Sequence, residues 1–160
     1  MKLNQARVSV GLLLLATFVG SVPTARAHSC STQGAAGDYG FTLTGVILTA
    51  TGSIPAAAVG RATVDVSGHV TGGEARSVAG GYADETFTGT LSVNSDCTGS
   101  MTLNFYEAGT LVRTSVLSVV FVDNQQELRM VQKSFTLPNG ASLPVVITAE
   151  AKRIFPDQLD

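Results

Sequence analysis

The strictest pattern in the sequence is an alternation of apolar and polar residues within residues 84–107. The first run keeps Phe87, Leu91 and Val93 on one parity with Thr or Ser between them, and residues 101–106 repeat the alternation after the stretch NSDCTG. A period of two over this length is typical of an antiparallel strand pair with one buried face. Asn, Asp and Gly between the runs favour a tight turn. We therefore expect a long β-hairpin at the centre of the chain.

The same alternation recurs along the rest of the chain, and no helical period follows residue 27. Eight antiparallel strands joined by short turns close naturally into an all-β, up-and-down barrel, because closure removes both sheet edges. A two-sheet β-sandwich is the alternative, although it typically needs longer crossover connections. The expected strands cover residues 39–48, 57–66, 69–78, 86–93, 101–106, 111–122, 127–134 and 143–153.

The first 27 residues have the organisation of a secretory signal peptide. Two basic residues precede an apolar run at residues 8–20, and Ala25-Arg26-Ala27 forms a small-x-small cleavage site. The apolar run is too short for a membrane-spanning helix. We expect residues 1–27 to be removed, and residues 28–160 to form a single domain that is secreted or periplasmic and does not span the membrane.

Cys30 and Cys97 are the only cysteines of the chain. In an oxidising exported compartment, two cysteines are expected to form a disulfide. The bridge would tie the start of the mature chain to the turn of the central hairpin. Closing a loop of roughly 68 residues would stabilise the fold by about 4 kcal/mol in the chain-entropy description.

Charge limits the partners of the expected domain. Residues 28–160 carry seven basic and twelve acidic residues, without a basic run, so we expect no nucleic-acid partner. An outer-membrane barrel would also use strands of about ten residues, but the sequence lacks aromatic girdles. The strand at Leu111–Val122 is apolar on both parities towards its end, which indicates either burial on both faces or a contact between copies in a homo-oligomer.

Four segments carry a resemblance to known proteins: GDYGFTLTG, AVGRATVDVSGHVTG, ETFTGTLSVNSDCTGSMTL and ELRMVQ followed by VVITAEAKR. They resemble small secreted bacterial proteins of unassigned role, similar in organisation to the eight-stranded barrels of the allene oxide cyclase and dirigent type. The resemblance covers nearly the whole mature chain and implies a calycin-like barrel that binds an apolar molecule and in some members cyclises it. No catalytic residue of those enzymes matches a motif here, so none is carried over.

The inward parity of the expected barrel is largely apolar, which favours a small apolar ligand in its interior. The same residues would equally form the filled core of an eight-stranded barrel. The expected lining consists of Phe41, Leu43, Phe87, Leu91, Met101, Leu103, Phe105 and Met130.

Three polar residues fall on the inward parity: Glu74, Tyr39 and Gln132. A lumenal Glu74, paired with Arg76 or hydrogen-bonded to Tyr39 or Gln132, would act as a general acid/base or orient the polar end of a ligand. A β-bulge at Gly72-Gly73 would instead turn Glu74 and Arg76 out to solvent. Both registers stay open at this point.

No motif for nucleophilic catalysis, phosphate binding or metal coordination stands out, and we predict neither a cofactor nor a metal. The nearest approach to a metal site is a copper pair formed by His28, which cleavage would make the N-terminal residue, and His69 in a predicted turn. Three functions remain: a binding barrel, a cyclase or isomerase, and an interaction protein with a filled core.

Overall fold

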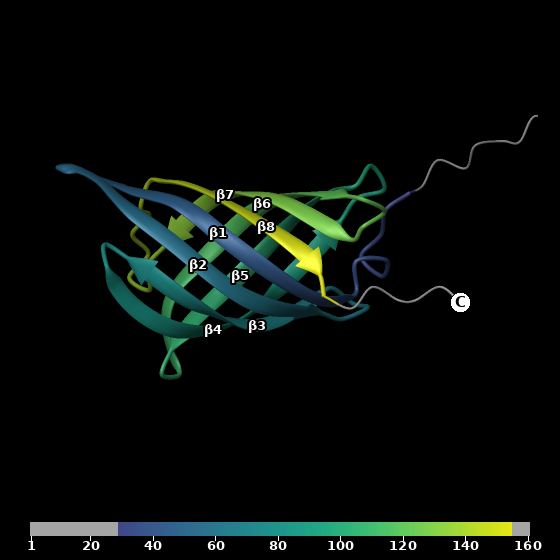
Figure 1. Ribbon diagram of the computed structural model, residues 1–160, viewed down its shortest axis with the longest axis horizontal. Helices are drawn as coiled ribbons and strands as arrows, with labels where there is room; N and C mark the ends of the chain where they lie inside the picture. The colour runs from purple at the N-terminus through teal and green to yellow at the C-terminus, as the bar shows by residue number, and fades with distance from the viewer. Residues whose placement is uncertain (1–28, 155–160) are drawn as a thin grey trace, which may run out of the picture.

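The computed structural model describes residues 29–154 and shows one sheet that closes on itself (Figure 1). Each strand pairs antiparallel with the next, and the last pairs with the first. The predicted up-and-down barrel is confirmed, and the β-sandwich alternative is wrong. The strands are β1 Gly37–Thr49, β2 Gly52–Val64, β3 His69–Val78, β4 Gly81–Val93, β5 Thr98–Glu107, β6 Thr110–Val122, β7 Glu127–Thr136 and β8 Val145–Arg153. The predicted signal peptide lies outside the described residues.

The largest error in strand boundaries concerns β1 and β2. We expected residues 49–55 to form a loop, but β2 begins at Gly52 and pairs with β1 up to Thr49. Val66, the last residue of the expected strand at 57–66, follows the end of β2 and is exposed. The two strands therefore form a long hairpin that reaches one end of the barrel, seen at the left of Figure 1.

The register of β3 is continuous through Gly72 and Gly73, so the alternative with a bulge there is wrong. The inward parity of Val70 is kept, and Glu74 points into the barrel. Arg76 shares that parity and lines the interior.

A bulge lies instead between β5 and β6. The hairpin turn pairs Tyr106 with Leu111, but Phe105 pairs with Arg113, so Val112 is left without a partner on β5. Because one inserted residue exchanges the two faces of a strand, this bulge puts Arg113 opposite the inward Phe105. A second shift, between Val116 and Leu117, leaves Lys133 of β7 unpaired.

Glycines make room for the aromatic side chains of the interior. Phe41 pairs across the sheet with Gly60, and Phe87 pairs with Gly72. A Cβ atom on Gly60 would lie 2.5 Å from the Phe41 ring, and one on Gly72 would lie 2.4 Å from the Phe87 ring. The rings of Phe41 and Phe87 contact edge to face, with centroids 5.9 Å apart, and Phe105 follows at 5.3 Å from Phe87.

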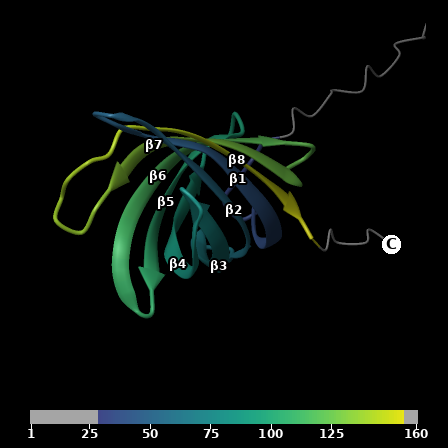
Figure 2. The ribbon, with the colours of Figure 1, turned by 60° about the vertical axis from the view of Figure 1, so that its left-hand side comes forward.

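One end of the barrel is closed by residues 29–36, which precede β1. Ala35 is fully buried there, and the Tyr39 hydroxyl donates a hydrogen bond of 2.8 Å to its carbonyl. Arg153, at the end of β8, donates to the Ala36 carbonyl at 2.8 Å. Figure 2 shows this end at the right, with the long hairpins pointing the other way. The β1–β2, β3–β4, β5–β6 and β7–β8 connections lie at the opposite end.

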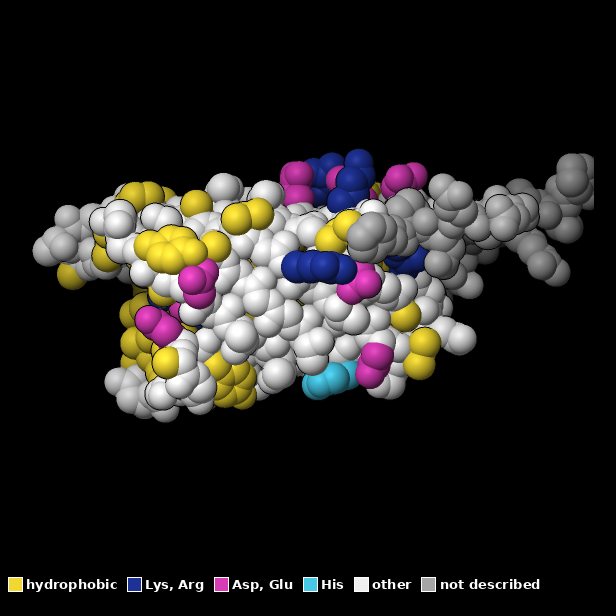
Figure 3. Space-filling model, turned by 60° about the horizontal axis from the view of Figure 1, so that its bottom comes forward, with side chains coloured by type: hydrophobic (Ala, Val, Ile, Leu, Met, Phe, Trp, Pro, Cys, Tyr) yellow, Lys and Arg dark blue, Asp and Glu magenta, His cyan; other side chains and the backbone are white. Residues whose placement is uncertain are grey.

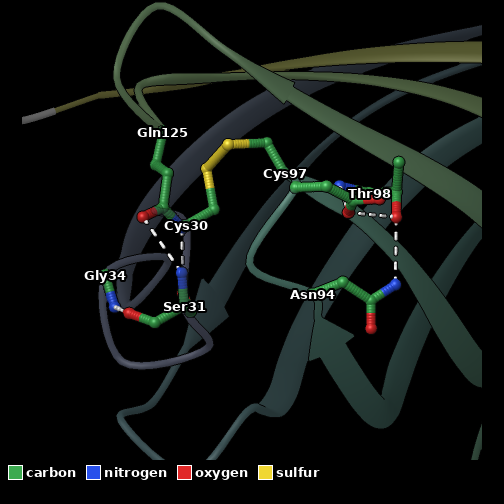
Figure 4. Close-up of a disulfide and its surroundings, with 8 residues drawn as sticks. Cys30, Ser31, Gly34, Asn94, Cys97, Thr98 and Gln125 are labelled. Atoms are coloured by element: carbon green, nitrogen blue, oxygen red, sulfur yellow. Dashed lines mark hydrogen bonds between the residues drawn. A yellow bond between two sulfur atoms is a disulfide. The ribbon is translucent and has the colours of Figure 1, made fainter. Parts of the chain in front are cut away.

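The predicted disulfide between Cys30 and Cys97 is present and holds this closing segment against the β4–β5 turn (Figure 4). Gln125 adds a second attachment, because its side-chain amide donates to the Ser31 carbonyl at 2.8 Å and accepts from the Ser31 amide at 3.3 Å. Residues 123–125 all have positive φ, between 50° and 63°. Non-glycine residues keep this conformation only where surrounding contacts fix it, and the Gln125 bonds supply such contacts.

Replacing both cysteines by serine (C30S with C97S) should lower the free energy of unfolding by about 2–4 kcal/mol. The loss is expected because the unfolded chain gains freedom and the closing segment loses its covalent attachment. Urea unfolding of the variant and of the oxidised wild type measures the difference, and reduced wild type is the control for the serine side chains. Equal midpoints for the variant and the oxidised protein would contradict the prediction.

Candidate functional site

The interior of the barrel contains a cavity of about 80 Å³ with mostly apolar walls. Seven of the eight predicted lining residues border it; Leu91 is buried but does not. An engineered protein cavity of ~150 Å³ binds benzene, so this lumen holds several waters or part of a one-ring molecule without rearrangement. The predicted residues that border the cavity are Phe41, Leu43, Phe87, Met101, Leu103, Phe105 and Met130.

The cavity extends towards the entrance, where Ile47, Val78 and Phe135 line it and are only partly buried. Figure 3 shows a recess at the left end of the molecule, where hydrophobic and acidic side chains meet. The β7–β8 ladder runs only from Glu127 to Val131 on β7. Beyond it, the Phe135 carbonyl accepts from the Leu143 amide at 2.9 Å, and Thr136 forms an isolated bridge with Ser142. The partial exposure of these lining residues indicates that the cavity opens towards the surface at this end.

A cluster of four charged side chains interrupts the apolar wall. Glu74 of β3 and Glu85 of β4 are direct cross-strand partners, and both are buried. Arg113 of β6 bonds to both: its Nη2 donates to Glu74 Oε1 at 2.7 Å, and its Nη1 donates to Glu85 Oε2. One planar guanidinium thus bridges two carboxylates that would otherwise repel each other.

Arg76 completes the cluster by donating from Nε to Glu85 Oε1 at 2.8 Å. Two carboxylates and two guanidinium groups face one another, so their formal charges balance. The Arg113 guanidinium carbon also lies 3.7 Å from the centre of the Phe105 ring, a cation–π contact. Its position is therefore determined both by ion pairs and by the aromatic wall.

Glu74 is the one member of the cluster with an unused oxygen. Its side chain is 1% exposed, and no donor within residues 29–154 bonds to its Oε2 atom. Burial raises the pKa of Glu74, and the charge and hydrogen bond of Arg113 oppose this rise. The neighbouring Glu85 adds to the rise through its charge and through a side-chain hydrogen bond between the two carboxyl groups. The lumen is thus lined by a carboxyl group that holds its proton more tightly than an exposed glutamate.

The partners that we predicted for Glu74 are wrong. Arg76 bonds to Glu85 instead, and Gln132 donates to Ser115 Oγ at 3.0 Å. The Tyr39 hydroxyl bonds at the closed end, where Arg153 also donates to it at 3.1 Å. Burial raises the pKa of Tyr39, and the Arg153 contact partly offsets the rise. All three predicted polar residues line the cavity, but Tyr39 and Gln132 do not bond to Glu74.

Sequence reasoning missed Glu85, Arg113 and Ser115. Glu85 has the parity of Phe87, so extending the hairpin alternation by one step would have placed it inside. Arg113 and Ser115 share the parity of Leu117, which is buried. The alternation of the sequence therefore indicated that these three residues point inward. They were missed because inward positions were assigned mainly to apolar residues.

The candidate copper pair receives no support from the structure. His69 is exposed at the start of β3, and His28 lies outside the described residues. Within residues 29–154, no three histidine, cysteine or acidic side chains are gathered as metal ligands require.

The β6 strand is buried on one face only, so the expectation of burial on both faces is wrong. Leu117, Val119 and Phe121 point inward, whereas Val120 and Val122 are exposed. A homo-oligomer contact through Leu111–Val122 stays a prediction. None of residues 29–154 belongs to a helix with the length and apolarity needed to cross a membrane.

Comparison with known proteins identifies the architecture alone. No protein-family model and no curated protein matches the chain. A solved structure described as EF1p2_mFAP2b bound to DFHBI is 11% identical, with a TM-score of 0.53 over 78% of this chain and 99% of that one. A redesigned β-barrel, mFAP1, bound to DFHBI, is 14% identical, with a TM-score of 0.50 over 77% of this chain and 98% of that one.

The variant R113M should lose about 3–5 kcal/mol of unfolding free energy, because it leaves two buried carboxylates without their shared partner. The matched control is R129M, since Arg129 forms its ion pairs on the outer surface and the change there should cost about 0–1 kcal/mol. Urea unfolding at neutral pH measures both. Equal losses in the two variants would show that the interior cluster is no more important than a surface pair.

The pH dependence of stability should contain a contribution from Glu74. Because the pKa of Glu74 is raised in the folded protein, the unfolded chain releases this proton first as pH increases. The contribution of Glu74 to the free energy of unfolding is fully present below the pKa of Glu74 in the unfolded chain. It is lost as pH rises through the pKa of Glu74 in the folded protein. The difference in unfolding free energy between wild type and E74Q should therefore fall as pH rises from 4 to 7. E150Q, changed on the outer face of β8, is the control; parallel curves for wild type and E74Q would contradict the prediction.

Proposed function

We propose that this protein is a secreted or periplasmic binding barrel that takes a small, largely apolar molecule into its lumen. The observation that carries the proposal is the combination of an open-ended apolar cavity with one buried carboxyl oxygen that has no donor. Pockets of this composition, mostly apolar with few placed polar groups, are typical of small-molecule sites.

Both structural neighbours support the proposal, because each is a barrel described as bound to DFHBI. Their likeness to this chain is one of fold, so the support concerns what such a barrel is able to hold and not the identity of the ligand. The resemblance to allene oxide cyclase and dirigent barrels stays a proposal of the same kind.

The proposed location rests on two features. The Cys30–Cys97 disulfide is compatible with an oxidising compartment. The organisation of residues 1–27, interpreted as a signal peptide, agrees with export.

A cyclase or isomerase is the second candidate, and the protonation behaviour of Glu74 favours it. A carboxyl group with a raised pKa inside an apolar lumen has the character of a general acid. In such an enzyme the barrel would hold the substrate in a reactive shape while Glu74 donated or removed a proton.

Native mass spectrometry of the exported protein, purified from its host without detergent, tests the main proposal. A bound organic molecule that is released on denaturation is the expected result, and its mass would identify the ligand class. A clean protein mass, with concentration-dependent assembly, would contradict it and favour an interaction protein with a filled core.

The variant E74Q then separates the binder from the enzyme once the released molecule is in hand. A binder should keep most of its affinity for that molecule, whereas an enzyme should lose its turnover of it, because an amide cannot exchange a proton in the way a carboxyl group does. E150Q is the matched control on the outer surface and should leave both properties unchanged.

A further inference from the structure

The polar part of the lumen imposes a requirement on any molecule that fills it. Glu74 Oε1 is bonded by Arg113, while Oε2 has no donor among residues 29–154 and is buried. A buried polar oxygen without a partner costs free energy, and the cost is larger when the group is charged. A ligand that donates a hydrogen bond to Oε2 removes this cost. A purely apolar ligand leaves Oε2 without a partner, so the cost stays in the complex.

We propose, on the basis of the binding function proposed above, that the ligand class is a neutral one-ring molecule whose single hydroxyl group hydrogen-bonds to Glu74 Oε2. A hydroxyl donates one hydrogen bond and accepts others. It therefore pairs with Glu74 in both protonation states, donating to the carboxylate and accepting from the carboxylic acid. Few other small neutral groups satisfy both states from one position.

The charges around Glu74 disfavour ionic ligands. An ammonium group at Oε2 would enter beside the Arg113 guanidinium, and a carboxylate would enter beside two glutamates. Because Arg76 and Arg113 already balance Glu74 and Glu85, an added charge of either sign would be buried without a counter-ion. The cluster thus favours a neutral head group.

The apolar wall of the lumen determines which apolar group the ligand carries besides its hydroxyl. Phe41, Phe87 and Phe105 form a continuous aromatic surface beside the cluster. The cavity of about 80 Å³ fits part of a ring, and the flexible Met130 and Met101 side chains border it and can adjust. A ring that stacks against the phenylalanines with its hydroxyl towards Glu74 uses both features.

The test compares p-cresol with p-xylene, in which a methyl group replaces the hydroxyl at nearly the same size; benzylamine is the cationic probe and benzoate the anionic one. Methionine methyl NMR of the full domain reports on the lumen directly, because Met101 and Met130 both line it and the third methionine of the chain is Met1. We expect p-cresol to bind about tenfold more tightly than p-xylene, and the charged probes to bind more weakly than either.

The outcomes separate the two proposals. Equal dissociation constants for p-cresol and p-xylene, or tightest binding of benzylamine or benzoate, would leave a binding lumen in place and overturn the hydroxyl requirement. No methionine shift with any probe would overturn the binding function itself and the requirement with it.

The variant E74M tests whether Glu74 is the residue that causes the preference for a hydroxyl group. It keeps the length of the side chain, removes both oxygens and leaves Arg113 bonded to Glu85. The ratio of p-xylene to p-cresol dissociation constants should fall to about one, whereas E150M on the outer face should keep the wild-type ratio. An unchanged ratio in folded E74M would overturn the assignment; if E74M does not fold, the wild-type probe series alone still decides the proposal.

Discussion

The Arg113 guanidinium holds together the part of the barrel in which the site lies. Glu74 and Glu85 stand opposite each other on adjacent strands, where like charges repel. Arg113 reaches them from β6, which is separated from β4 by β5. Three strands, β3, β4 and β6, therefore meet through one planar side chain. The contact also leaves Glu74 with a free oxygen, so the interaction that stabilises the interior creates the polar point of the cavity.

The two ends of the barrel differ for a related reason. At the closed end, the disulfide, the Gln125 amide and the Tyr39 hydroxyl satisfy the polar groups of the segment that covers the interior. At the other end, the connections diverge and the lumen wall is apolar up to the charged cluster. The closed end carries the covalent attachment and these hydrogen bonds, although the buried Gln126 Oε1 and Arg153 Nε atoms there have no partner among residues 29–154. Glu74 Oε2 is the buried atom without a partner that belongs to a residue lining the lumen.

Alternation was sufficient to predict the strands, because a half-buried strand must place every second residue against the core. The strand register was harder to predict where glycines interrupted the alternation of apolar and polar residues. Gly72 and Gly73 are typical of a bulge, yet the first makes room for the Phe87 ring and the second continues the ladder. The real bulge, at Val112, lies in a run without a distinctive composition. Local sequence therefore indicated the wrong place for the change of register.

By itself, the sequence determined the all-β class, the number of strands, the disulfide pair and seven residues that line the cavity, out of eight predicted, since each follows from local periodicity or from there being only two cysteines. Only the tertiary structure decided which polar side chains meet inside. Glu74 and Arg113 are 39 residues apart in the chain, and the bulge at Val112 together with barrel closure brings them into contact. No local pattern encodes such a pairing, because it depends on the register of every strand between them.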